Sequence, residues 1–117
     1  MNSIGLTKNF EAEGQIHKYR IVKAGSDERK VVQANGAAGI IGVTGSRGAK
    51  TAGDRVDVVL SGIHSVEFGA DIPAWSWITA DAEGRAVVAG ATSPAIGRAL
   101  EKGVAGAYGD ILICHQR

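Results

Sequence analysis

The sequence has little of what marks a secreted, a membrane-bound or a nucleic-acid-binding protein. Its 117 residues include one cysteine, two prolines and two each of tryptophan, tyrosine and phenylalanine, and the formal net charge is +1. The single cysteine, Cys114, excludes a disulfide within the chain. The near-neutral charge gives no electrostatic reason to expect a nucleic acid or a membrane surface as partner.

Long apolar runs are also missing. Residues 1–6 have neither the basic start nor the apolar stretch of a secretion signal. No segment approaches the roughly 20 apolar residues of a membrane span. We therefore expect the chain to be made in the cytoplasm.

What the sequence has in excess is glycine, with 17 residues. Together with much valine and alanine, this composition favours short strands and many turns. The clearest strand lies within 53–62, which has glycine at both ends and alternates apolar with charged residues before running wholly apolar. Alternation predicts that Arg55 and Asp57 face solvent. A weaker copy of this segment, 109–114, ends the chain.

The two segments belong to a repeat of the whole chain. At an offset of 55 or 56 residues, Trp75 corresponds to Tyr19 and Asp110 to Asp54. Residues 13–62 and 68–114 each read as strand, turn, short strand, turn, strand, long loop and strand. We predict an all-β fold, a small β-sandwich or barrel of the β-tulip or jelly-roll kind, with a pseudo-repeat of about 55 residues. Residues 1–10 are predicted to be an extended N-terminal arm and 11–117 a single β domain.

One segment is ambiguous between helix and strand. Ser93, Pro94 and Gly103 supply the N-cap, the first-position proline and the terminal glycine of a short helix over 94–102. The repeat instead makes 95–100 a strand. We favour the strand.

The Gly-rich basic segment 42–51 resembles a phosphate-binding P-loop. That motif requires lysine directly after its last glycine and a helix behind it, whereas here Ala49 intervenes and a strand follows. We expect no nucleotide site. Residues 40–44 are predicted to be a short strand and 45–52 a surface loop whose Arg47 and Lys50 meet a partner.

Residue types that serve catalysis are present without the spacing that catalysis needs. His17, His64 and His115 are far apart and in no paired spacing typical of metal ligands. No serine, histidine and acidic set stands at a recognisable spacing. We therefore predict a protein that is not an enzyme and has no catalytic residue, metal or cofactor.

Trp75 and Trp77 are two residues apart, so they are predicted to share one face of a strand that begins near Pro73. Packing against the core is one interpretation of this pair. A second is an interface anchor, because tryptophan is frequent at binding hot spots. A third is a stacking platform for sugar rings, which would make the chain a carbohydrate-binding β-module on a virion or cell surface.

Four segments resemble the small capsid cement, or head-decoration, proteins of tailed bacteriophages, and the similarity covers roughly residues 10–114. These segments are Ile40–Thr44, Ala52–Gly62, Asp81–Val87 and Ala95–Glu101. The resemblance implies a β-rich, non-enzymatic protein that binds the outer surface of the assembled, expanded lattice of the major capsid protein and stabilises it. It implies a homo-oligomer, usually a trimer, that is made in the bacterial host cytoplasm. Family members commonly have glycine where this chain has Ala74 or Ser76.

A role of this kind requires contact residues, and the sequence offers three groups. The apolar residues of the N-terminal arm are predicted to dock on the coat lattice or on a neighbouring copy. The cations of the Gly-rich loop are predicted to meet the capsid, and the tryptophan pair to form the contact between copies. The candidates are Ile4, Leu6, Phe10, Arg47, Lys50, Trp75 and Trp77.

Overall fold

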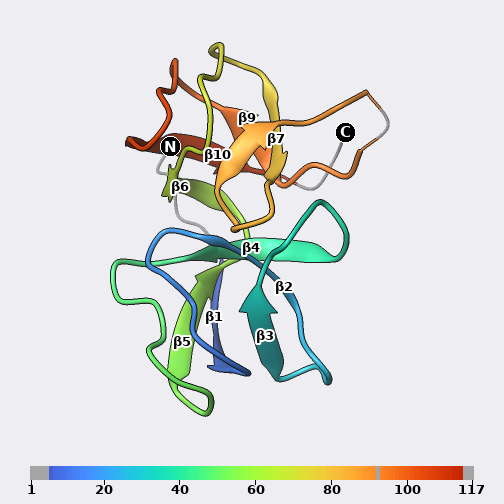
Figure 1. The fold of residues 1–117 in the computed structure, drawn as a ribbon, viewed down its shortest axis with the longest axis vertical. Helices are drawn as coiled ribbons and strands as arrows, with labels where there is room; N and C mark the ends of the chain where they lie inside the picture. Colours follow the sequence, from blue (N-terminus) through green and yellow to red (C-terminus); the bar gives the residue numbers. More distant parts are fainter. Residues whose placement is uncertain (1–5, 92, 115–117) are drawn as a thin grey trace.

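The structure, a computed structural model, describes residues 6–91 and 93–114 (Figure 1). These residues form ten β-strands and no helix, which confirms the predicted all-β class. It follows that they contain no helix long and apolar enough to cross a membrane. The first half holds β1 (Thr7–Ala12), β2 (Ile21–Ala24), β3 (Lys30–Gln33), β4 (Ile40–Thr44) and β5 (Arg55–Val59). The second half holds β6 (Gly62–Glu67), β7 (Trp77–Ala80), β8 (Ala86–Val88), β9 (Gly97–Ala99) and β10 (Tyr108–Ile113).

The first half is a closed barrel with the strand order β1-β3-β2-β4-β5. Its pairings are antiparallel except that of β1 with β3. In β5 the alternation works as predicted: Val56 and Val58 are buried inside the barrel, while Arg55 and Asp57 are exposed. The barrel core consists of Phe10, Ala12, Ile16, Val22, Val31, Ala49, Val56 and Val58.

The second half is a five-stranded sheet with the order β6-β10-β9-β7-β8. Its outer strands approach each other at one parallel bridge, between Phe68 and Ala86. The second sheet lies against the barrel near β4 (Figure 1). Its interior shares one apolar cluster with residues from the outside of the barrel. Those barrel residues are Ile21, Ala34, Ile40 and Val43. The two halves are therefore joined by a common core.

The two halves repeat the same pairings. β1 and β5 pair Asn9 with Asp57, and β6 and β10 pair Ser65 with Asp110. Each pair is also joined through its side chains, by Asn9 Nδ2 to Asp57 Oδ1 at 3.0 Å and by Ser65 Oγ to Asp110 Oδ1 at 2.9 Å. Asp110 thus corresponds to Asp57 and not, as predicted, to Asp54. The sequence offset between equivalent residues of the two halves is smaller for the last strand than for the strands before it. It is smaller because the loop before β10 is shorter than the loop before β5.

Two further boundaries are set by the structure. Residues 97–99 form β9 and no residue of 93–102 is helical, so the favoured strand is confirmed over 97–99 of the predicted 95–100. Residues 7–10, predicted as part of an extended arm, belong to β1 and pair with β5. Their apolar residue Phe10 fills the barrel, and this burial fixes the segment in the sheet.

Gly97 and its counterpart Gly42 lie where neighbouring backbone comes close. A Cβ on Gly42 would lie 2.5 Å from Val59 O, and one on Gly97 would press directly on the carbonyl oxygen of Leu112. We expect Gly97→Ala to lower the free energy of unfolding by about 2–3 kcal/mol, because the strands must separate to admit the methyl group. Gly45→Ala, which meets nothing within 4 Å, should change it by less than about 0.5 kcal/mol. Urea denaturation of both variants provides the measurement, and equal effects would contradict the explanation.

Candidate functional site

The first and third strands of each half lie side by side, β1 beside β3 in the barrel and the end of β6 beside β8 in the second half. The hydrogen bonds that continue this contact differ between the two halves. In the barrel, Glu11 N donates a hydrogen bond directly to Arg29 O at 2.9 Å. The repeated register equates Glu11 with Glu67, and the matching hairpins equate Arg29 with Gly84. A second half closed in the same way would therefore join Glu67 N to Gly84 O.

Residues 19–21 of the first half occupy that place. Glu67 N donates to Tyr19 O at 2.9 Å, and Ile21 N donates to Gly84 O at 2.7 Å. The close approach needs glycine, since a Cβ on Gly84 would lie 2.9 Å from Ile21 O and its φ is +78°. The segment thus satisfies backbone groups that an open sheet edge would leave unpaired.

Arg20, in the middle of this segment, joins the halves through its side chain. Its Nε and Nη2 lie 3.1 Å and 3.0 Å from Glu67 Oε1, and its Nη1 donates to Glu83 O at 2.8 Å. The Arg20 and Glu67 side chains are 14% and 17% exposed. A charge pair so far withdrawn from water is costly to break, because each group alone would be poorly solvated.

Tyr19 and its counterpart Trp75 share an uncommon backbone conformation. Their φ angles are 54° and 70°, in the left-handed region, so the strands begin only after them. The Tyr19 ring lies against the second half, with its centroid 5.9 Å from that of His64 and 5.4 Å from that of Tyr108. Trp75 makes no such ring contact with the residues that the structure describes and is 59% exposed.

The left-handed turn overturns the prediction that Trp75 and Trp77 share a strand face. Trp77 begins β7 and aligns across the sheet with Arg98, which aligns in turn with Leu112 of β10. Ile63 of β6 is paired with Leu112 and completes the row. Ile63, Leu112 and Trp75 are exposed, while Trp77 and Arg98 are half-buried. We call the surface formed by this row and by Trp75, whose backbone oxygen Arg98 contacts, the second-half face; its residues are Ile63, Trp75, Trp77, Arg98 and Leu112.

The equivalent row of the barrel is Thr7, Val59, Val43 and Ile21. Val43 and Ile21 are fully buried there, because the second half covers them. The surface by which the first half binds the second is thus repeated on the second half. On the second half it remains at the molecular surface.

Arg98 organises the second-half face. Its guanidinium carbon lies 5.0 Å from the centroid of the Trp77 ring, and its Nε donates to Trp75 O at 2.9 Å. The cation therefore covers the ring that a sugar would stack on. This geometry does not provide the flat tryptophan pair that the carbohydrate-binding interpretation requires.

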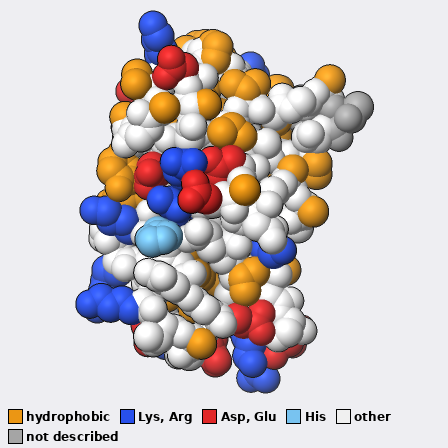
Figure 2. All heavy atoms as spheres, viewed as in Figure 1, with side chains coloured by type: hydrophobic (Ala, Val, Ile, Leu, Met, Phe, Trp, Pro, Cys, Tyr) orange, Lys and Arg blue, Asp and Glu red, His pale blue; other side chains and the backbone are white. Residues whose placement is uncertain are grey.

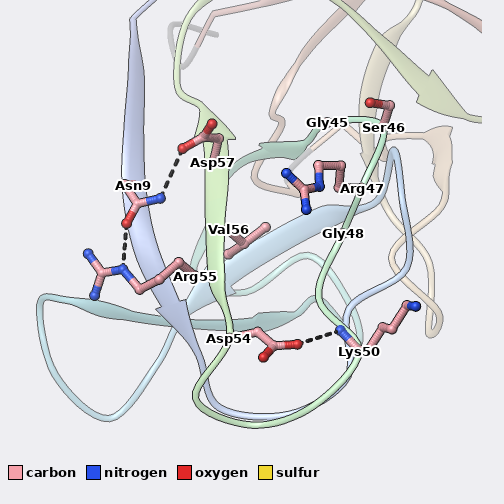
Figure 3. Close-up of a pocket in the computed structure, with 10 residues that line it drawn as sticks. All are labelled: Asn9, Gly45, Ser46, Arg47, Gly48, Lys50, Asp54, Arg55, Val56 and Asp57. Atoms are coloured by element: carbon pink, nitrogen blue, oxygen red, sulfur yellow. Dashed lines mark hydrogen bonds between the residues drawn. The ribbon is translucent and has the colours of Figure 1, made fainter.

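The loop with Arg47 and Lys50 borders a cleft of about 710 Å³ on the barrel (Figure 3). In Figure 3 the Arg47 side chain extends into the cleft towards β5, whereas the Lys50 side chain points away from it at the rim. The full lining is Asn9, Gly45, Ser46, Arg47, Gly48, Lys50, Asp54, Arg55, Val56 and Asp57.

The residues of the predicted arm are separated by the fold. Phe10 is 6% exposed in the barrel core and has no surface to offer a partner. Leu6 is 69% exposed and is held to the end of β5 by a hydrogen bond from Leu60 N to Leu6 O. Ile4 lies outside the described residues. The candidate contact residues are therefore dispersed over the barrel surface, the cleft and the second-half face.

The sequence analysis missed Arg98, Ile63 and Leu112. Leu112 carried a signal, because alternation within 108–113 places it opposite the buried Ile111 and Ile113. Arg98 carried none, since its partners are distant in sequence. On the face drawn in Figure 2, side chains of both charges gather near mid-height and hydrophobic side chains are spread over the upper part. Within the described residues, no group of three or more histidine, cysteine or acidic side chains is placed to hold a metal ion.

Comparison with known proteins identifies the fold through structure and not through sequence. No protein-family model matches the chain, and no curated protein sequence is similar to it. Among solved structures the fold is that of a bacteriophage head protein. One matching structure is the N base of the head fiber gp8.5 of bacteriophage phi29, with a TM-score of 0.71 and 18% sequence identity over 97% of this chain and 98% of that one.

The Arg20–Glu67 pair should be a main determinant of stability. We expect Glu67→Ala to lower the free energy of unfolding by roughly 2–3 kcal/mol, because it leaves Arg20 withdrawn from water without its carboxylate. Glu83→Ala serves as the control: it removes one of the two carboxylates paired with Arg85, in a pair whose side chains are 31% and 65% exposed, and should cost less than about 1 kcal/mol. Urea denaturation measures both, and a Glu67 effect no larger than the Glu83 effect would refute the role of the pair.

Proposed function

We propose that this chain is a decoration protein of a bacteriophage head, without enzymatic activity. The observation that carries the proposal is the likeness of the whole chain, not of a fragment, to the base of a phage head fiber. The resemblance of four sequence segments to capsid cement proteins supports the same class. In this role the protein lies on the outer surface of the virion and binds the lattice of the major capsid protein.

The physical effect of such binding is stabilisation of the shell. A protein that binds the expanded lattice and not its dissociated subunits shifts the equilibrium towards the shell by mass action. Many copies on one lattice add their contributions, even where each contact is weak. The exposed Leu6 and the cations Arg47 and Lys50 are the capsid contacts that this proposal includes.

The proposal also includes a contact between copies, through the second-half face. Its support is the repeat itself, because the equivalent surface of the first half is buried against a β-sheet. Trp75 stands where Tyr19 makes its ring contacts, and tryptophan at the centre of an interface contributes strongly to affinity. A trimer is the oligomer that the sequence resemblance implies.

Binding to the capsid is tested by co-sedimentation with shells of the matching coat protein in expanded and immature forms. We expect saturable binding to expanded shells and little binding to immature ones, because expansion creates the lattice geometry that is recognised. Expanded shells carrying the protein should also withstand higher temperature than bare shells. Absence of binding to expanded shells would refute the proposed function.

Contact between copies is tested by Trp75→Ala in sedimentation velocity. We expect the dissociation constant of the oligomer to rise roughly 30-fold, which corresponds to the loss of about 2 kcal/mol at a hot spot. Leu6→Ala, which removes another exposed apolar side chain, is the control and should leave the oligomer unchanged. An oligomer that Trp75→Ala does not weaken would exclude the second-half face as the contact.

A further inference from the structure

In the second half, a carboxylate of the chain itself stands at a place equivalent to the wall of the barrel cleft. There, the loop after β9 carries Glu101, and Glu101 Oε2 accepts a hydrogen bond from Asp110 N at 3.2 Å. Asp110 is the counterpart of Asp57, which lines the cleft. In the barrel, the loop 45–54 has Ser46 at the position equivalent to Glu101, and its one acidic residue is Asp54. The cleft thus lacks the group that occupies the same place in the repeat.

The acidic residues that line the cleft are already used within the chain. Asp54 Oδ2 accepts hydrogen bonds from the backbone N of Lys50 and of Thr51, each at 3.1 Å. Asp57 Oδ1 accepts the hydrogen bond from Asn9 Nδ2 at 3.0 Å (Figure 3). Their charges are therefore partly offset by donors that belong to the fold.

The side chains of the cations in the cleft have most of their hydrogen-bond donors unoccupied. Arg55 Nε donates to the Asn9 side chain at 2.6 Å, which occupies one of its donors. Among the residues that the structure describes, the side chains of Arg47 and Lys50 make no hydrogen bond or ion pair. A guanidinium inside a cleft, with all its donors available, is suited to receive a carboxylate through two parallel hydrogen bonds.

We infer that the cleft binds an acidic side chain on an extended segment of a partner protein. Arg47 receives the carboxylate inside the cleft, and Lys50 at the rim attracts further negative charge on the same segment. A volume of about 710 Å³ admits a few residues of an extended chain. The inference deepens the proposed function, in which Arg47 and Lys50 are capsid contacts, by giving the chemistry of the segment that these two cations receive.

The test uses the full chain, labelled with ¹⁵N, and two peptides, hexaglutamate and hexaglutamine. We expect hexaglutamate to shift the amide resonances of 45–50 and 54–57 with a roughly millimolar dissociation constant, as one or two exposed ion pairs allow. The shifts should diminish as salt is added, because exposed charges are screened. Arg47→Glu should weaken binding at least about tenfold, whereas Lys102→Glu, which reverses an exposed cation of the second half, should not.

Three results would overturn the inference. They are equal resonance shifts with hexaglutamine, hexaglutamate binding that Arg47→Glu does not weaken, or equal shifts with inorganic phosphate at the same ionic strength. The last would indicate a site for small anions without preference for a peptide carboxylate. Co-sedimentation with capsids is a separate readout. Hexaglutamate binding by a protein that does not bind capsids would support the cleft and refute the proposed function.

Discussion

The structure depends on one insertion: residues 19–21 of the first half lie between the strands that would otherwise close the second half. Glu67 N and Gly84 O bind this segment and not each other, whereas the equivalent groups of the barrel, Glu11 N and Arg29 O, are joined directly. The partly buried ion pair of Arg20 with Glu67 and the ring contacts of Tyr19 follow from the same insertion. Because the second sheet obtains part of its closure and part of its core from the first half, the two repeats form one cooperative body.

The insertion also makes the molecule asymmetric. The first half uses its outer row to bind the second half, whereas the same row of the second half is not covered by any part of the chain that the structure describes. The changes along this row are informative, since Val43 is replaced by Arg98 and Ile21 by Trp77. Arginine lying over tryptophan keeps an apolar surface compatible with water while retaining a large area for contact. A surface of this composition is typical of the central part of a protein interface.

Strand content and the repeat could be predicted from the sequence because both depend on local patterns. The alternation of Arg55, Val56, Asp57 and Val58 indicated one buried face, and the structure has that face. The left-handed turn at Trp75 could not be predicted, since non-glycine residues seldom adopt it and no local residue type demanded it. Phe10 was assigned to an arm because its barrel neighbours, such as Val56, are distant in sequence. The second-half face was recognised in part: Trp75 and Trp77 stood out by type, whereas Arg98 acquires its role only through the pairing of β7 with β9.

The central claim is that the repeat leaves one half's docking surface available on a protein that decorates a capsid. Electron cryomicroscopy of expanded capsids saturated with the protein tests it most directly. The account predicts density for the chain on the outer surface of the shell, with Trp75 and Arg98 buried between neighbouring copies. Absence of this density, or density in which the second-half face is open to solvent, would contradict the account.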